Sequence, residues 1–371
     1  MVLMPVKKSI LCPFFKFEIF SIWSLVICQI SSGQSSLSRM RRKGFVDLQV
    51  NGYQGVDFSS PELSTDDVHV ITEALLRAGT VGYCATLITA DIDIYERNLP
   101  LLSRVMEEPG VKDHLLGIHL EGPYLSPSEG ARGAHSPAKM RRPDTEEFSK
   151  FQDWAGGKLV ILTLAPEIEG ALQLISHVRK NYSTLLSVGH HLASREILKR
   201  AAENGASLIT HLGNGCPNQL PRHDNVLIHQ LVSDALTAGI ITDGHHIPDD
   251  FIRVVLRCKG VDRVFVVSDC VPIAGYEPGI YETLGNKVRL TASGRVESLH
   301  AQHLVGSACN MAQCMRFLKS LGLLTEDDLW KVGLENPLKI LGLANPPNSW
   351  DSLPDLPISD CGLRIADSES T

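Results

Sequence analysis

The sequence predicts an α/β fold, a TIM-like (β/α)8 barrel, from three observations. Eight short apolar runs rich in β-branched residues occur between residues 44 and 268. Several of these runs are apolar throughout, for example VFVV at 264–267, as in strands that are buried on both faces. The segments between the runs are mostly long enough for a crossover helix, and eight strand-then-helix units in this order fit a barrel.

The barrel strands are predicted from these apolar runs in chain order. They are Gly44–Val50, Thr80–Ile88, Leu115–Leu120, Lys158–Leu164, Leu185–Val188, Ser207–Thr210, Ala238–Thr242 and Arg263–Ser268. A doubly wound open sheet is the alternative arrangement. Because no GxGxxG motif opens a helix after the first run, a dinucleotide-binding fold has little support.

Start and stop signals locate several of the helices. Asp66–Ala78 follows a cap region of Ser, Thr and Asp, and Ser194–Asn204 begins with a capping serine. Both patterns end directly before a glycine, which is a common helix stop. Two further helices are expected near Ala308–Leu321 and Glu326–Leu334.

The two ends of the chain differ from the barrel segment, which we expect at 44–344. Residues 345–371 form a tail rich in Pro, Ser and Asp, typical of a loop or a disordered end. Residues 1–43 are expected to be a disordered leader or an upstream extension. The alternative is a signal peptide with Ile19–Ile30 as its apolar region, although no convincing A-x-A cleavage site follows.

Composition narrows the class of function. The net charge of -7 includes no basic excess, so nucleic acid is not expected as a partner. A membrane is not expected as a partner either, because the apolar stretch at 19–30 is too short to span a bilayer. The nine cysteines are scattered without a CxxC pair, which argues against a thiolate zinc site. Scattered thiols favour a reducing compartment, so we expect a cytoplasmic protein unless the leader is a genuine export signal.

Polar residues gather where the predicted strands end, and in a barrel these ends meet at one mouth. Glu121, His190 and His211 follow the third, fifth and sixth strands. Imidazole nitrogen and carboxylate oxygen are ligands that suit Zn²⁺, with Fe²⁺ or Co²⁺ as alternatives. A single histidine is often only a satisfied core residue, but two histidines and a glutamate at matching strand ends predict a metal site.

Asp269 follows the last apolar run, at the same mouth. A carboxylate there can take a proton from activated water and pass it to a leaving group, or it can simply cap the next turn. Arg222 lies in a loop after His211, where it can grip a phosphate or carboxylate or remain a solvated surface residue. His135 and His246 can donate hydrogen bonds to a substrate carbonyl, or have no role.

A series of motifs in chain order resembles those of the N-acetylglucosamine-6-phosphate deacetylases, a family of the amidohydrolase superfamily. The motifs are GFVDLQVNG (44–52), HLEGPYLSP (119–127), GAHSP (133–137), LAPE (164–167), SVGHH (187–191), THLGNG (210–215), TDGHH (242–246), VSDCVPIAG (267–275) and LVGSACNM (304–311). The resemblance covers roughly residues 44–343. It implies a homodimer that hydrolyses the acetamide of N-acetylglucosamine 6-phosphate to glucosamine 6-phosphate and acetate, in amino-sugar catabolism.

The resemblance also implies roles for individual residues. Glu121, His190 and His211 resemble the family's metal ligands, and Asp269 resembles its catalytic acid/base. Asn214, Gly215 and Arg222 resemble the sugar-phosphate contacts, with the arginine reaching a neighbouring subunit's site in family dimers. The full set of expected substrate contacts is Ala134, His135, Asn214, Gly215, Arg222, His246, Leu304, Val305 and Gly306.

Two departures from related patterns refine these expectations. Many amidohydrolases carry HxH after the first strand for a second metal ion, but Gln49 and Asn51 stand there, so one ion is expected. The small β-sandwich that flanks the family's barrel is expected to be reduced or missing. Two other functions stay open: an amidohydrolase acting on a different N-acyl sugar or cyclic amide, and a non-catalytic barrel relative.

Overall fold

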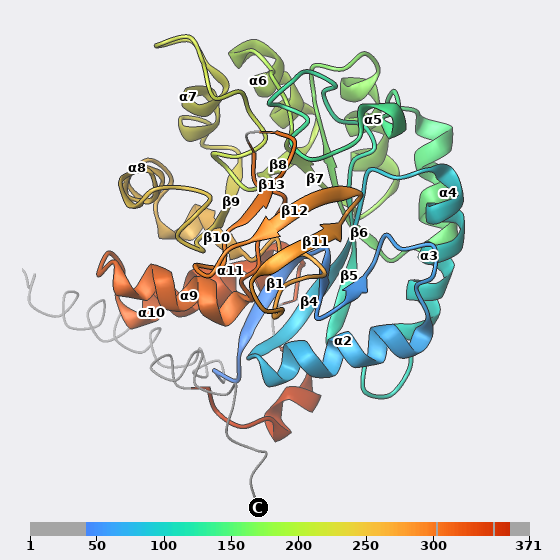
Figure 1. The fold of residues 1–371 in the computed structure, drawn as a ribbon. Coiled ribbons are helices and arrows are strands. Elements are labelled where there is room, and N and C mark those ends of the chain that lie inside the picture. The colour runs from blue at the N-terminus through green and yellow to red at the C-terminus, as the bar shows by residue number, and fades with distance from the viewer. Residues whose placement is uncertain (1–41, 302, 344–345, 357–371) are drawn as a thin grey trace, which may run out of the picture. The chain divides into compact units, whose positions relative to one another are not determined.

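An eight-stranded parallel sheet curves into a barrel in this computed structural model, which describes residues 42–301, 303–343 and 346–356 (Figure 1). The barrel strands, in their order around the sheet, are β1 (Phe45–Val50), β4 (Thr80–Ile88), β5 (Leu115–Glu121), β6 (Leu159–Leu164), β7 (Leu185–Val188), β8 (Ala206–Ile209), β9 (Thr237–Ile241) and β10 (Val264–Val267). Each predicted strand agrees with an observed one to within one residue at either end. The predicted barrel is therefore confirmed.

The first and last strands meet just beyond their carboxyl ends. Val50 and Cys270 form a parallel bridge, and the backbone N–H of Asp269 donates to the carbonyl of Gln49 over 3.1 Å. These contacts bring β1 and β10 together, so the strand ends form one mouth.

One helix follows each barrel strand, on the outside of the sheet (Figure 1). The helices are α2 (Thr65–Arg77), α3 (Ile92–Val105), α4 (Thr145–Trp154), α5 (Ala171–Asn181), α6 (Arg195–Asn204), α7 (Val226–Leu231), α8 (Asp249–Lys259) and α9 (Met311–Ser320). The helices predicted at 66–78, 194–204 and 308–321 are confirmed as α2, α6 and α9. No helix in the described part of the chain is long and apolar enough to cross a bilayer.

Local sequence signals explain how these helices begin. At the start of α2, the Ser64 hydroxyl accepts a hydrogen bond from the backbone N–H of Asp67, and the Asp67 carboxylate accepts one from the N–H of Ser64. This reciprocal capping box satisfies two N–H groups that the helix cannot pair internally. The face that α2 buries carries Val68, Ile71 and Leu75.

The helix predicted at 326–334 is longer than expected. It runs from α10 (Glu326–Trp330) through a single π-helical turn (Lys331–Glu335) into α11 (Asn336–Ile340). Pro337 does not end it, because the proline directly follows the π-helical turn, where the regular i→i−4 pairing is already interrupted.

A three-stranded antiparallel sheet, which the sequence patterns did not predict, is inserted between β10 and α9. It consists of β11 (Gly279–Thr283), β12 (Asn286–Leu290) and β13 (Val296–Ser298). A second small element is the hairpin of β2 (Gly52–Tyr53) and β3 (Val56–Asp57). The inserted sheet packs on the loops that border the barrel mouth, through a cluster of Val271, Ile273, Val288, Leu290, Val296 and Val305.

Several predictions about the chain ends fall on residues outside the described ones. These are the leader apart from residues 42–43, most of the tail, and the reduced or missing sandwich that both ends would form. Part of the tail, 346–356, packs on the barrel instead of lying free. There, Trp350 is buried, and its indole N–H donates to the carbonyl of Asp113 over 3.0 Å.

Candidate active site

The four residues at the centre of the site lie at the carboxyl ends of barrel strands. Glu121 is the last residue of β5, and the other three each stand two residues beyond the end of β7, β8 or β10. His190, His211 and Asp269 have positive φ angles of 51°, 28° and 52°. Such angles are uncommon outside glycine and concentrate at functional sites. Here they turn the chain sharply and direct the three side chains into the barrel mouth.

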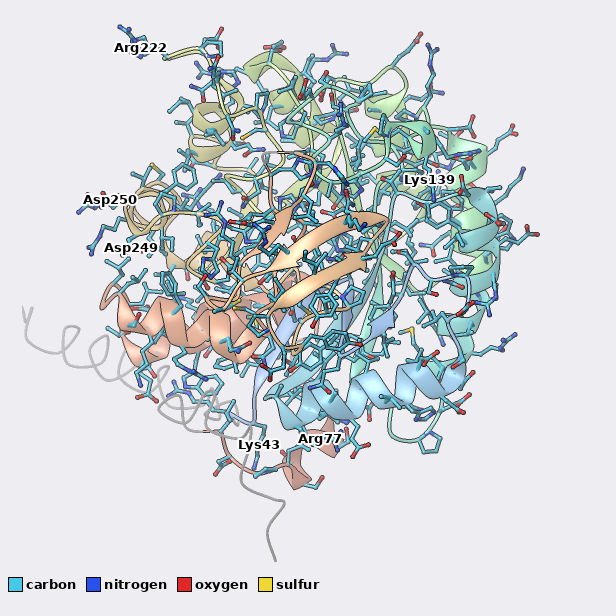
Figure 2. The ribbon with its side chains drawn as sticks, in the orientation of Figure 1. Lys43, Arg77, Lys139, Arg222, Asp249 and Asp250 are labelled. Carbon is cyan, nitrogen blue, oxygen red and sulfur yellow. The ribbon has the colours of Figure 1, made fainter. Side chains whose placement is uncertain are left out.

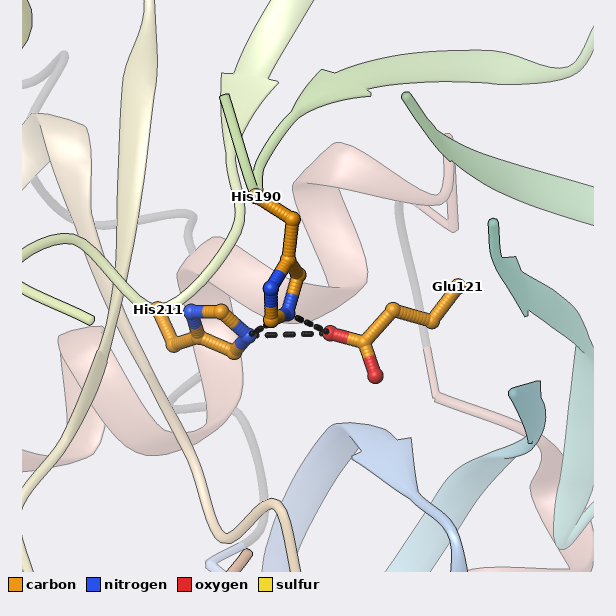
Figure 3. Close-up of side chains that lie close together, drawn as sticks. All are labelled: Glu121, His190 and His211. Atoms are coloured by element: carbon orange, nitrogen blue, oxygen red, sulfur yellow. Dashed lines mark hydrogen bonds and ion pairs between the residues drawn. The ribbon is translucent and has the colours of Figure 1, made fainter. Parts of the chain in front are cut away.

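Glu121, His190 and His211 form a buried cluster (Figure 3). The Oε1 atom of Glu121 lies 2.9 Å from Nε2 of His211 and 3.3 Å from Nε2 of His190. The two Nε2 atoms lie 3.2 Å apart. Their donor atoms all lie within 4.8 Å of one another, so the three residues can hold a metal ion.

The hydrogen bond on the far side of the His190 ring fits this arrangement. Its Nδ1 lies 2.8 Å from the carbonyl oxygen of Ala131, so Nδ1 carries the proton and Nε2 keeps its lone pair for the cluster. The two imidazole nitrogens and the carboxylate oxygen all direct lone pairs toward the same space. A metal cation or a proton is therefore needed between them. The glycine at 215 makes room for the ring, because a Cβ there would lie 2.9 Å from His190 Nδ1.

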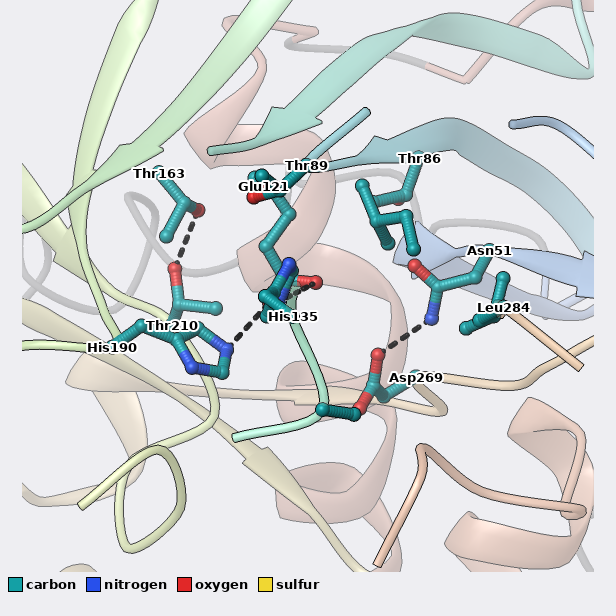
Figure 4. Close-up of polar contacts among 12 residues, drawn as sticks. Asn51, Thr86, Thr89, Glu121, His135, Thr163, His190, Thr210, Asp269 and Leu284 are labelled. Atoms are coloured by element: carbon teal, nitrogen blue, oxygen red, sulfur yellow. Dashed lines mark hydrogen bonds and ion pairs between the residues drawn. The ribbon is translucent and has the colours of Figure 1, made fainter. Parts of the chain in front are cut away.

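Two amides at the end of β1 hold Asp269, and one of them, that of Gln49, also links it to the cluster. Gln49 Nε2 donates to Oε1 of Glu121 over 2.8 Å and to Oδ1 of Asp269 over 3.0 Å. Asn51 Nδ2 donates to the same Asp269 oxygen over 2.7 Å (Figure 4). Burial and the nearby Glu121 carboxylate raise the pKa of Asp269 to about 6.

Two further histidines face this centre from different loops. His135 Nε2 lies 3.6 Å from Oε2 of Glu121, and burial lowers the pKa of His135 to about 3, so its ring is neutral. His246 Nδ1 lies 2.7 Å from Oδ2 of Asp243. Asp243 also accepts backbone N–H groups of 245 and 246, and despite its burial these partners hold its pKa below the usual range.

The cluster opens into a cavity of about 1080 Å³. Every predicted site residue except one lines this cavity. The residues brought together are Glu121, Ala134, His135, His190, His211, Asn214, Gly215, His246, Asp269, Leu304, Val305 and Gly306. The exception is Arg222, which is exposed and projects away from the body of the barrel (Figure 2).

Comparison with known proteins places the chain in a family. No family model matches it. The N-acetylglucosamine-6-phosphate deacetylase of Bacillus subtilis is 32% identical over 303 residues, which cover 81% of this chain and 75% of the relative. The chain belongs to the N-acetylglucosamine-6-phosphate deacetylase family. The human deacetylase of that name is 31% identical over 331 residues, covering 84% of this chain and 77% of the relative.

Solved structures agree with this assignment. The N-acetyl-D-glucosamine-6-phosphate deacetylase of Mycobacterium smegmatis superposes with a TM-score of 0.72 at 28% identity, over 82% of this chain and 78% of that one. An aspartate-to-alanine mutant of that enzyme, in complex with N-acetyl-D-glucosamine-6-phosphate, superposes with a TM-score of 0.73 at 27% identity, over the same shares of the two chains. The enzyme from Pasteurella multocida gives 0.72 at 29% identity, over 81% of this chain and 76% of that one.

Some residues around the deacetylase cavity were not predicted from the sequence. Asp243, which orients His246, lies three residues before it in the motif TDGHH, a signal that was present but not used. Most of the others come from loops whose position in the fold no periodicity indicates. These are the cationic or imidazole side chains Arg132, His245, Arg295, His300 and His303, and the apolar Leu284. The remaining one, Ile88, ends the predicted strand β4, but its place in the cavity was not predicted.

Proposed function

We propose that this chain hydrolyses the acetamide of N-acetylglucosamine 6-phosphate to glucosamine 6-phosphate and acetate. The observation that carries the proposal is the grouping of Glu121, His190 and His211 with Asp269 at one barrel mouth, in a chain of the deacetylase family. This grouping offers a metal-ion site beside a carboxylate whose pKa suits proton transfer near neutral pH.

We propose one divalent ion, zinc, held by Glu121 and by the Nε2 atoms of the two histidines. The donor set of two imidazoles and one carboxylate is that of many catalytic zinc sites, and the tautomer of His190 leaves its Nε2 free to bind. When bound, such an ion supplies Lewis acidity to the amide carbonyl and to the attacking water. Gln49 and Asn51 support a single ion, because their amides are already engaged with Glu121 and Asp269.

Asp269 is the proposed general base and then the general acid. In its ionised form it accepts the proton of the attacking water as the new bond to the amide carbon forms. It then returns that proton to the departing amine nitrogen as the C–N bond breaks, so the carboxylate is regenerated. The hydrogen bonds from Gln49 and Asn51 hold its Oδ1 atom in place during both transfers.

His135 and His246 are proposed to contact the substrate. A neutral His135 ring can donate one hydrogen bond to the amide oxygen, where negative charge develops. The carboxylate of Asp243 on Nδ1 of His246 directs the Nε2 atom of that ring toward the cavity, where sugar hydroxyls would lie. Asn214 and Gly215, which line the same cavity, are the proposed contacts of the phosphate.

In a homodimer, Arg222 of one subunit would contact the substrate phosphate bound in the site of the other subunit. Arg222 is absent from the cavity of its own chain, and α7, which follows the Arg222 loop, exposes apolar side chains. Ile228 of α7 is 43% exposed, and Val232, the residue directly after the helix, is 57% exposed, as expected for a face that a second subunit covers.

The described cysteines are free thiols, which supports a cytoplasmic location.

Acetate release from N-acetylglucosamine 6-phosphate tests the proposed function. The zinc-loaded protein is expected to release acetate and glucosamine 6-phosphate in equal amounts. With unphosphorylated N-acetylglucosamine, kcat/KM should be lower by roughly 100-fold, because the charge-assisted contacts to the phosphate are lost. Absence of acetate from a folded protein that contains zinc would exclude this function.

A further inference from the structure

Leu284 occupies a backbone conformation that a leucine rarely adopts. Strands β11 and β12 are paired through Thr283 and Asn286, so Leu284 and Gly285 form a two-residue hairpin turn. Their φ angles are 49° and 71°. A turn with two positive φ angles is of type I′, which strongly prefers Asn, Asp or Gly at both positions. A bulky apolar residue at the first of these positions indicates a function for its side chain.

Leu284 lines the catalytic cavity together with Asn51, His135 and Asp269, and it packs, partly buried, against the apolar cluster of the inserted sheet. Figure 4 shows it extending from the hairpin turn toward Asn51 and Asp269. The turn is also tied to the loop that carries His135, because Asn286 Nδ2 donates to the carbonyl of Ala134 over 3.2 Å. The turn is therefore positioned against the site by a hydrogen bond as well as by the apolar packing of the inserted sheet.

The place of Leu284 decides which part of a substrate it would meet. Ile88, the last residue of β4, lines the same cavity, and β4 stands four positions from β8 in the eight-strand order, so it lies across the barrel from His211. The donors proposed for the sugar and phosphate follow β8 and β9. With the amide carbon beside Asp269, the sugar extends toward these strands and the acyl chain extends the opposite way, toward Ile88 and Leu284.

We propose that Leu284 and Ile88 form the wall of an acyl pocket, and that Leu284 restricts the enzyme to short acyl groups such as acetyl. The inference rests on the proposed deacetylase function and adds its acyl-group specificity. An apolar wall suits the acetyl methyl group, and a side chain fixed on a tight hairpin excludes a longer chain that a mobile loop would admit. The strained turn is retained because the side chain closes the pocket.

The test compares kcat/KM for the N-acetyl, N-propionyl and N-butyryl derivatives of glucosamine 6-phosphate. In Leu284→Ala, the ratio of butyryl to acetyl kcat/KM should rise at least tenfold over wild type, because one or two methylene groups in an apolar pocket change discrimination by about 10- to 200-fold. Leu284→Gly should act the same way, and glycine favours the turn, so it covers the case in which the alanine variant folds poorly. Ile88→Ala should shift the ratio in the same direction.

Ile280→Ala is the matched control, since Ile280 lies on the same hairpin, is 60% exposed and does not line the cavity. The ratio of butyryl to acetyl kcat/KM in Ile280→Ala should stay within twofold of wild type. Unchanged ratios in both Leu284 variants would overturn the proposal. Calorimetry on Asp269→Asn protein, with and without Leu284→Ala, measures the affinity for the same three compounds without turnover, and so tests how each acyl group fits the pocket. If no acetate is released but Leu284→Ala still improves butyryl binding, the pocket stands and only the proposed reaction fails.

Discussion

Asn51 Nδ2 donates a hydrogen bond of 2.7 Å to Oδ1 of Asp269, and this bond joins the end of the first barrel strand to the end of the last. As the sequence motifs led us to expect, Asn51 stands where many amidohydrolases carry a histidine for a second metal ion. Here the Asn51 amide holds the Asp269 carboxylate directly. Because the amide donates a hydrogen bond to this carboxylate, it favours the ionised form of Asp269. Asn51 thus holds in place the carboxylate that we propose as the general base.

Removal of this amide in Asn51→Ala should lower kcat by roughly 10- to 100-fold while KM changes little, since the carboxylate loses its orientation but the substrate contacts remain. The loss of a donor also raises the pKa of Asp269, so the acid limb of the pH–rate profile should move to higher pH. Steady-state kinetics from about pH 5 to about pH 9 measure both effects. A kcat within twofold of wild type, with an unmoved acid limb, would argue against a positioning role.

Metal content tests the single-ion site. Purified wild-type protein should contain about one equivalent of zinc per chain by elemental analysis, and Glu121→Gln should lose most of it, because the cluster loses its only carboxylate. Glu129→Gln is the matched control: Glu129 lines the same cavity but is outside the three-residue cluster. Two equivalents per wild-type chain, or full zinc in the Glu121 variant, would contradict the site as described.

The barrel could be predicted because its strands leave a strong local signal. Runs such as VFVV at 264–267 are apolar throughout. Because the strands are parallel, the polar residues at their carboxyl ends face one mouth of the barrel, independently of how the loops fold. The inserted sheet could not be predicted in the same way. Its strands alternate buried and exposed residues over five positions at most, and their contacts with Val271 and Val305 depend on tertiary packing. Leu284 was missed for this reason, since a Leu-Gly pair is a weak turn signal.

Arg222 tests whether the phosphate is held across a subunit interface. Arg222→Ala should raise KM for the phosphorylated substrate by roughly 10- to 100-fold with little change in kcat, as expected for the loss of a charge-assisted contact. Arg142→Ala should leave KM unchanged, because Arg142 is 83% exposed and pairs with Glu169.

A mixing experiment separates contact within one chain from contact between chains. Arg222→Ala and Asp269→Asn proteins are denatured, mixed and refolded, so that some dimers contain one chain of each kind. If Arg222 acts on its partner's site, these dimers regain a site with low KM. If the activity of the refolded mixture equals the summed activities of the two separately refolded variants, Arg222 does not act in trans.

Asp47 should make stability depend on pH without taking part in the reaction. It is fully buried beneath the mouth, and burial raises its pKa from 3.8 to about 7. Between these values the folded state binds more protons than the unfolded state, so this group's contribution to stability is largest at low pH and falls as the pH rises to about 7. The loss should be on the order of 4 kcal/mol.

Asp47→Asn removes this titration and keeps the fold of the strand. The asparagine oxygen can still accept the backbone N–H groups of Gln49 and Ser268, while Oδ2, which its amino group replaces, has no hydrogen-bond partner. Urea unfolding at about pH 5 and about pH 8 should show the variant gaining stability relative to wild type at the higher pH. If the difference in unfolding free energy between variant and wild type is the same at both pH values, Asp47 does not titrate between them.

The most direct test of the account is the rate of acetate release from N-acetylglucosamine 6-phosphate by zinc-loaded wild-type and Asp269→Asn proteins, measured side by side. We predict that wild type turns the substrate over and that the variant, with the same zinc content and melting behaviour, is slower by about 10³-fold or more. A variant that releases acetate within tenfold of the wild-type rate would contradict the assignment of Asp269 as the residue that carries the proton.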